Sequence, residues 1–173
     1  ILQLNAFNSG LALLPMTIVI MIVMVGLTGK LVAKFGFKKN LVAGLISLTL
    51  SLILFSIVPS NGTYLLNVLP ASLLGALGMS LAYIPGTMAS MSGAKPEETG
   101  LASGIVNTSY QIGSAIGLAV IAVIAAAVTK SGITAGVNET EALNNGFQTA
   151  FISAAVIGAV SVLIAVFKIK HSK

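Results

Sequence analysis

The side chains of this chain that could act on a small molecule are concentrated in one apolar segment, GLASGIVNTSYQIGSAIGLAV, residues 100–120. Hydroxyl and amide groups recur there at the spacing that places residues on one arc of a helix. They are Ser103, Asn107, Tyr110, Gln111 and Ser114. Amides are costly in hydrocarbon unless their polar atoms are satisfied. The arc therefore has two interpretations: it faces a solute in a water-filled cavity, or its amides hydrogen-bond to another helix.

Three prolines in apolar segments could shape such a cavity, namely Pro15, Pro70 and Pro85. Pro85 removes one backbone donor and should leave the carbonyl of Leu81 without its helical partner. It therefore predicts a bend or a polar patch in the wall, although a helix kinked only to fit its neighbours is the alternative. Tyr83 lies beside this proline, and we expect its hydroxyl to face the arc from the opposite wall.

Ionisable side chains are missing from the apolar segments. The acids are Glu97, Glu98, Glu139 and Glu141, which lie between those segments, and the single histidine is His171. A proton relay needs a titratable group at membrane depth. Metal centres and catalytic dyads need clustered ligands or acids, and cysteine is absent. We therefore expect no enzyme, no metal site and no cofactor in this chain.

The composition indicates a chain surrounded by lipid. Of 173 residues, 56% are hydrophobic and 8% are charged, and the mean hydropathy is +1.03. Soluble domains carry about 25% charged residues. A transmembrane barrel would show alternating segments, whereas these apolar runs are continuous, so helices are predicted. We predict an all-α integral membrane fold, with residues 1–173 as one domain and spans at 10–28, 41–58, 64–91, 101–128 and 147–167.

The lysines predict the orientation of these spans. The segment GKLVAKFGFKK, residues 29–39, holds four of the nine lysines between the first two spans. With Lys95 and the C-terminal tail it places eight lysines on one side, against Lys130 on the other. Such a bias marks the cytoplasmic side. The N-terminus is then expected outside and the C-terminus inside, and at least one further span is expected upstream. The positive charge is thus explained by topology rather than by nucleic-acid binding.

A short pattern opens two of the predicted helices. Residues 9–12 read SGLA and residues 99–102 read TGLA, and the two helices begin on opposite sides of the membrane in the predicted topology. Inverted repeats leave this kind of trace in transporters. The pattern predicts that these two helices are related by pseudo-symmetry and that both line a central cavity.

Three stretches resemble the 14-span drug:proton antiporters of the major facilitator superfamily, EmrB/QacA type. They are FNSGLALLPM (7–16), GKLVAKFGFKK (29–39) and ETGLASGIVNTSYQIGSAIGLAV (98–120). The resemblance covers nearly the whole chain and implies the last five helices of such a carrier, a partial C-terminal half. It also implies coupling to protons. The partners that it implies are a small-molecule substrate, the lipid bilayer and a missing N-terminal half of the transporter.

The resemblance also implies a cytoplasmic gating loop at residues 29–39. Gly29, Lys34, Gly36, Lys38 and Lys39 match the loop pattern of the superfamily, and Ala33 stands where the pattern has an acid. In the family the loop ties neighbouring helices together, and the acid contributes to that latch. With Ala33 the basic residues are left with a topological role or a weakened gating role.

The function expected from the resemblance is efflux of small amphipathic compounds across the cell membrane by proton antiport. Two alternatives remain from the sequence. One is an exporter of another substrate class in the same superfamily. The other is a membrane subunit or relic fragment that does not transport.

Overall fold

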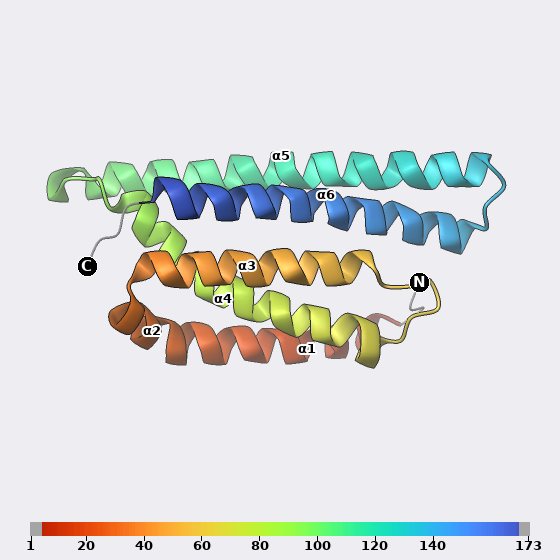
Figure 1. Ribbon diagram of the computed structural model, residues 1–173, viewed down its shortest axis with the longest axis horizontal. Coiled ribbons are helices and arrows are strands. Elements are labelled where there is room, and N and C mark those ends of the chain that lie inside the picture. The colour runs from red at the N-terminus through yellow and green to blue at the C-terminus, as the bar shows by residue number, and fades with distance from the viewer. Residues whose placement is uncertain (1–4, 170–173) are drawn as a thin grey trace.

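The computed structural model describes residues 5–169 and consists of long helices joined by short connectors, with no β-strand in that part of the chain (Figure 1). Its elements are α1 (Ala6–Met21), the π-helical η1 (Ile22–Leu27), α2 (Thr28–Phe35), α3 (Phe37–Ser56), the π-helical η2 (Tyr64–Val68), α4 (Leu69–Met91), the 3₁₀ turn η3 (Pro96–Glu98), α5 (Thr99–Thr134) and α6 (Glu139–Lys168). The described residues form five continuous helical segments that are long and apolar enough to cross a membrane. The predicted all-α membrane fold with five spans is confirmed.

The spans differ from the expected ranges at several ends: the fourth helical segment runs from Pro96 to Thr134, the fifth begins at Glu139, and the first differs at the lysine segment. The first helical segment does not end near residue 28 but continues through η1 and α2 to Phe35. Gly36 then breaks the helix with a φ of 80°, a left-handed conformation that glycine adopts at little steric cost. Helix α3 begins at the next residue. The segment 29–39 is therefore helical on both sides of one glycine.

The α3–α4 pair has the most extensive packing in the structure, because small residues let the two backbones meet. A Cβ atom built on Gly44 would lie 2.6 Å from the amide nitrogen of Ala82, and one built on Gly78 would lie 2.6 Å from the amide nitrogen of Leu48. The Ser47 hydroxyl donates to the carbonyl of Leu74 at 2.8 Å, and the Ser51 hydroxyl donates to that of Ala71 at 2.7 Å. Both bonds cross between the helices beyond the Gly44–Gly78 contact, toward the end of α3 and the start of α4.

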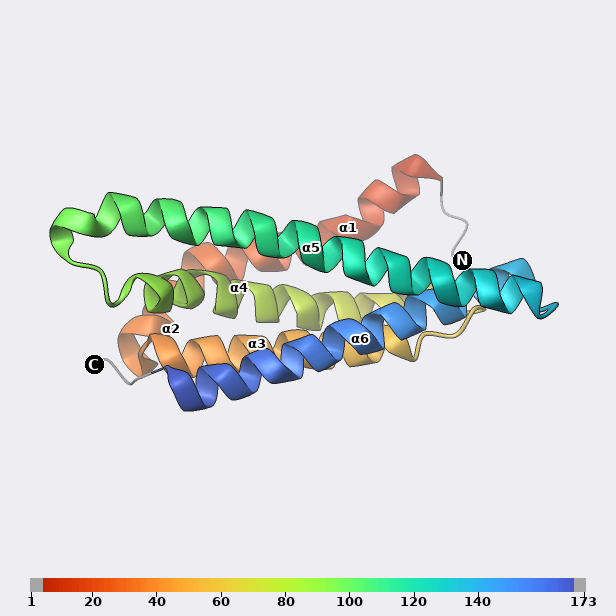
Figure 2. The same ribbon diagram turned by 90° about the horizontal axis from the view of Figure 1, so that it is seen from above.

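Helix α6 packs against both α3 and α5, so it connects the two sides of the bundle (Figures 1 and 2). Gly158 lies against Thr49 of α3, and Gly146 lies against Ala125 and Thr129 of α5. The rings of Phe55 and Phe151 stack with centroids 5.0 Å apart.

A second link between α3 and α6 lies where α3 ends. The amides of Asn144 and Gln148 both donate to the carbonyl of Val58, at 3.2 and 2.8 Å. This carbonyl precedes Pro59 in the turn that follows α3. One backbone oxygen thus accepts two side-chain donors from α6.

The first helical segment is held to α4 through a buried polar contact where η1 meets α2. The fully buried Thr28 hydroxyl lies 3.0 Å from the carbonyl of Val23 and 3.1 Å from that of Ser80. The Ser80 hydroxyl donates to Ala76 within its own helix at 2.7 Å. π-Helical turns often occur at functional sites or hinges. No pattern in the sequence distinguished Thr28 and Ser80 from the other scattered hydroxyl residues.

The prolines occupy different kinds of position. Pro15 and Pro85 lie inside α1 and α4, and Pro85 is buried. Pro70 instead lies in the first turn of α4, directly after η2, where a missing N–H costs little. Leu81, whose carbonyl Pro85 should release, lies at the close contact with α3: the Cβ built on Gly44 would lie 2.8 Å from its carbonyl carbon.

Candidate solute cleft between α3, α4 and α5

A cleft of about 720 Å³ lies where α5 separates from α3 and α4. Helices α4 and α5 are consecutive, yet they pack sparsely against each other compared with α3–α4 or α5–α6. Figure 2 shows α5 crossing above α4 with a connection at one end. Pockets for small molecules typically measure 300–1,000 Å³ and are mostly apolar with a few polar groups. The volume of this cleft is in that range.

The cleft has an apolar base and a rim that carries hydroxyl groups. Leu41, Leu45 and Leu48 of α3 contribute to the base, together with Met79 and Ala82 of α4. Thr87 and Ser90 of α4 and Ser109 of α5 add hydroxyl groups. The first two hydroxyls donate to carbonyls one turn earlier in α4, at 3.1 and 2.9 Å, so their oxygens can still accept a hydrogen bond.

Two tyrosines meet across the cleft. The rings of Tyr83 on α4 and Tyr110 on α5 have centroids 6.1 Å apart and an interplanar angle of 85°, an edge-to-face arrangement. Such pairs contribute about 0.5–1.5 kcal/mol beyond the area they bury. Both rings are about half exposed, at 46% and 54%. They present aromatic surface and hydroxyl groups to whatever enters the cleft.

The structure brings two of the six predicted cavity residues together. Tyr83 and Tyr110 line the cleft, whereas Ser103, Asn107, Gln111 and Ser114 are not among its lining residues and are exposed on α5. On a helix, Val106 and Ser109 lie to one side of Tyr110, and Asn107 and Gln111 lie to the other. The cleft is therefore centred on the side of α5 away from the amides.

The amides of Asn107 and Gln111 make no hydrogen bond to another helix within residues 5–169, and the Ser114 hydroxyl donates to the carbonyl of Gln111 at 3.0 Å. The glycines of the same helix are equally uncovered: a Cβ on Gly100, Gly104, Gly113 or Gly117 would meet nothing within 4 Å. This face of α5 is not packed against the described chain.

Sequence reasoning missed Met79, Thr87, Ser90 and Ser109. A signal for three of the cleft residues was present, because Tyr83, Thr87 and Ser90 follow one another at the i, i+4, i+7 spacing of a single helix face. The leucines of α3 carry no such signal, since a base of leucine is indistinguishable in sequence from a surface that faces lipid.

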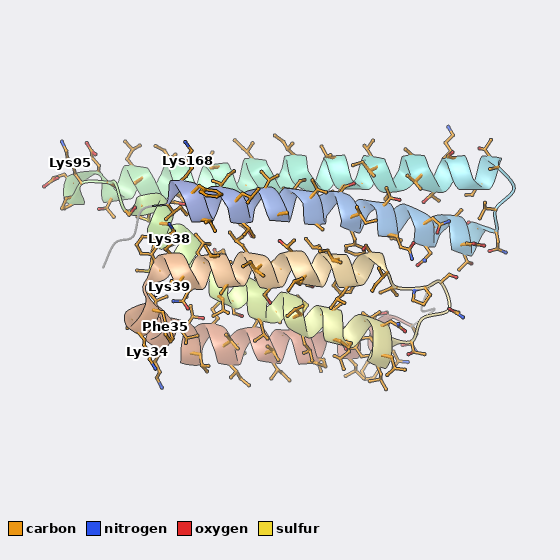
Figure 3. All side chains as sticks on the ribbon, in the orientation of Figure 1. Lys34, Phe35, Lys38, Lys39, Lys95 and Lys168 are labelled. Carbon is orange, nitrogen blue, oxygen red and sulfur yellow. The ribbon has the colours of Figure 1, made fainter. Side chains whose placement is uncertain are left out.

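The lysine segment lies at the end of the bundle where α2 and α3 meet (Figure 3), and Leu41 of the cleft lining follows Lys39 by two residues in α3. Gly29 and Lys34 are in α2, Gly36 is the break, and Lys38 and Lys39 are in the first turn of α3. Ala33 is exposed on α2. The Lys38 ammonium donates to the carbonyl of Val166 near the end of α6, at 2.8 Å. The segment is thus tied to α6 through a lysine, without an acid.

The two helices that open with SGLA and TGLA begin at opposite ends of the bundle (Figure 1). This is the geometry that an inverted repeat requires.

Among residues 5–169, no group of three or more histidine, cysteine, aspartate or glutamate side chains is placed to hold a metal ion. The lysines and glutamates of the described spans all lie near helix ends, and the cleft is lined by apolar, hydroxyl and aromatic residues. The arrangement can hold a molecule through apolar contact, aromatic stacking and hydrogen bonding.

Comparison with known proteins identifies the family. Two curated relatives, each a "Multidrug resistance protein Stp" of Mycobacterium tuberculosis, one from strain CDC 1551 / Oshkosh and one from strain ATCC 25618 / H37Rv, are 34% identical to this chain over 119 residues. The match covers 69% of this chain and 22% of each relative, so the chain spans about a fifth of their length. Residues 1–118 match the family described as Major Facilitator Superfamily. The chain therefore belongs to the Major Facilitator Superfamily of transporters.

Proposed function

We propose that this chain is the C-terminal part of a larger carrier that exports small amphipathic compounds in exchange for protons. The observation that carries the proposal is the cleft with its tyrosine pair. Apolar leucines and a methionine would hold the body of such a compound, and the rings of Tyr83 and Tyr110 would stack on aromatic groups. The name of the mycobacterial relatives adds support for the substrate class.

Proton coupling would come from residues outside this chain. Within the described spans the lysines and glutamates lie toward the membrane surfaces, and the cleft lining holds none of them. A coupling group needs to titrate at depth. We infer that such a group belongs to the N-terminal half of the carrier.

We place the lysine end in the cytoplasm and the protein in the plasma membrane, with the N-terminus of this chain outside and its C-terminus inside. Six of the lysines in residues 5–169 lie in α2, α3, the α4–α5 connector and the end of α6, and Lys130 lies near the opposite end. Single cysteines at Ser60 and Ser92 would report the sidedness. Labelling of Ser60→Cys from outside intact cells, with Ser92→Cys protected, is expected, and the reverse pattern would invert the topology.

The transport proposal is tested with the full-length protein in lipid vesicles. A pH gradient of either sign across the vesicle membrane is expected to drive ethidium, an aromatic cation, in the opposite direction to the protons. Pyranine trapped in the lumen would report the proton flux. If ethidium moved equally well without a gradient and with no change in pyranine signal, proton antiport would be refuted.

Site variants separate this cleft from the rest of the carrier. Tyr83→Ala is expected to raise the ethidium concentration for half-maximal transport about 2- to 13-fold, from the typical energy of an aromatic pair. Tyr83→Phe keeps the ring and should change it less, and Ser114→Ala on the exposed face of α5 serves as a control. Equal effects of Tyr83→Ala and Ser114→Ala would place the substrate elsewhere.

The alternatives predict different results in the same vesicles. A carrier for another substrate class would exchange protons for a different solute and would not transport ethidium. A membrane subunit or relic fragment would show neither flux.

A further inference from the structure

We propose that the lysine end of the bundle binds the phosphate headgroup of an anionic phospholipid, through a surface formed by Lys34 and Lys39 on either side of Gly36. This goes beyond the proposed transport function and does not depend on it. The partner is a lipid because the lysines lie where membrane-spanning helices end, next to exposed apolar side chains.

The charge of the described chain is divided unequally between its ends. The lysine end holds six lysines and two glutamates, and the other end holds Lys130 with Glu139 and Glu141. Glu97 and Glu98 belong to the η3 turn beside Lys95. Figure 3 shows Lys95 on the α5 side of the bundle, away from Lys34 and Lys39 on the side of α2 and α3. The acids of this end therefore do not accompany the Gly36 lysines.

Two placements in this surface are unfavourable for a chain on its own. Lys30 and Lys34 are four residues apart in α2, so their like charges share one helix face. Lys38 and Lys39 lie in the first turn of α3, where the helix dipole favours acids, and no side chain caps that turn. An anion bound at this surface relieves both repulsions.

Of the two lysines in the first turn of α3, Lys38 has a hydrogen-bond partner that accounts for its position. Lys38 donates to the carbonyl of Val166 in the last turns of α6, where the helix dipole favours a cation. Lys39 is exposed and has no such contact within residues 5–169. The Asn40 amide does not cap the helix either, because it donates to the carbonyl of Gly36 at 2.7 Å.

Phe35 indicates where the surface formed by Lys34 and Lys39 lies relative to the membrane. Its ring is 46% exposed, and the Lys34 ammonium lies 5.3 Å from its centroid (Figure 3). An exposed ring beside a long cationic side chain suits the boundary between acyl chains and headgroups. The positive φ of Gly36 turns the chain there, between Lys34 near the end of one helix and Lys39 in the first turn of the next.

The test measures lipid binding by the solubilised full-length protein, with bound lipids counted by native mass spectrometry. Dioleoyl-phosphatidylglycerol is expected to bind in preference to dioleoyl-phosphatidylcholine, and the preference should weaken as ionic strength rises. A basic residue at an anionic membrane surface contributes about fivefold in affinity. The Lys34→Gln/Lys39→Gln variant should therefore bind phosphatidylglycerol about 25-fold more weakly.

Two controls distinguish charge at this surface from charge in general. Lys34→Arg/Lys39→Arg keeps the charges and should bind within about twofold of the parent, given similar headgroup attraction. Lys130→Gln removes a lysine at the other end and should leave binding unchanged.

Three results would overturn the proposal. They are equal binding of the two lipids by the parent protein, equal loss in Lys130→Gln and in the double glutamine variant, and displacement of bound phosphatidylglycerol by inorganic phosphate but not by chloride at the same ionic strength. The last would show a site for a free anion instead of a lipid. The lipid preference and its salt dependence are measured on the parent protein, so they stand even if the double variant folds poorly.

Discussion

The contact between α3 and α4 makes a quantitative prediction about Gly78. A Cβ at this position would lie 2.6 Å from the amide nitrogen of Leu48, 2.7 Å from its Cγ and 2.8 Å from the carbonyl oxygen of Gly44. Ordinary contacts between carbon atoms are about 3.5–4.0 Å. Two of the three atoms belong to the backbone, so a side-chain rotation cannot relieve the overlap. Gly78→Ala therefore forces α3 and α4 apart by roughly 1 Å.

The energy of this separation has three contributions. Overpacking typically costs about 1–3 kcal/mol. The hydrogen bonds from Ser47 and Ser51 cross the same interface, and such bonds contribute about 0.6 kcal/mol each in membrane proteins. Stretching both of them therefore costs about 1 kcal/mol in total. Alanine stabilises a helix by about 1 kcal/mol relative to glycine. The expected net loss in the free energy of unfolding is about 1–3 kcal/mol.

The measurement is reversible unfolding of the full-length protein in mixed micelles of increasing SDS content, followed by circular dichroism. Gly104→Ala on α5 is the matched control, because the same methyl group meets nothing within 4 Å. It gains helix propensity without overlap and should be neutral or stabilising by up to about 1 kcal/mol. If Gly78→Ala and Gly104→Ala unfolded at the same SDS fraction, the close α3–α4 contact would be refuted.

Three further predictions concern side-chain contacts between helices. Thr28→Val removes the buried hydroxyl beside the carbonyls of Val23 and Ser80 and should cost about 0.6–1.7 kcal/mol in the SDS titration. Thr17→Val, whose exposed hydroxyl bonds only within α1, should cost less, and equal costs would show that the contact between Thr28 of α2 and Ser80 of α4 contributes nothing. Asn144→Leu/Gln148→Leu leaves the Val58 carbonyl without its two donors and should lower the free energy of unfolding by about 1 kcal/mol. It should also broaden the distribution of distances between spin labels at positions 57 and 143, and an unchanged distribution would contradict the link. Tyr110→Leu removes the edge-to-face contact and should weaken ethidium binding about as much as Tyr83→Ala. The loss of binding in the double variant should be smaller than the sum of the two single losses because the rings act as a pair, and full additivity would show that they bind independently.

Much of the fold could be predicted because lipid imposes a simple rule on sequence. Apolar runs of about 20 residues without charges can only be helices in a bilayer. The ends of the spans were less predictable: α5 extends past residue 128 to Thr134, with Lys130 in its last turns. A long lysine side chain reaches the interface from inside a helix, so a charge does not mark where the helix ends.

The candidate site could be predicted only in part. Tyr83 and Tyr110 were identifiable because a polar aromatic residue in an apolar helix needs a place for its hydroxyl. Asn107 and Gln111 follow the same reasoning, but the described chain contains no helix that covers them. Which face of α5 meets α4 depends on how α6 packs against both α3 and α5, and periodicity within one helix does not contain that information.

The sequence by itself determined that this chain is a helical membrane domain, where its spans lie, and which end carries the positive charge, because these depend on composition along the chain. Only the tertiary structure decided that Gly44 and Gly78 bring two backbones into contact, that Thr28 and Ser80 meet in the interior, and that Lys38 reaches the end of α6. Those contacts join residues that are from 34 to 128 positions apart. They depend on the relative rotation and crossing of helices, and packing between small residues sets both.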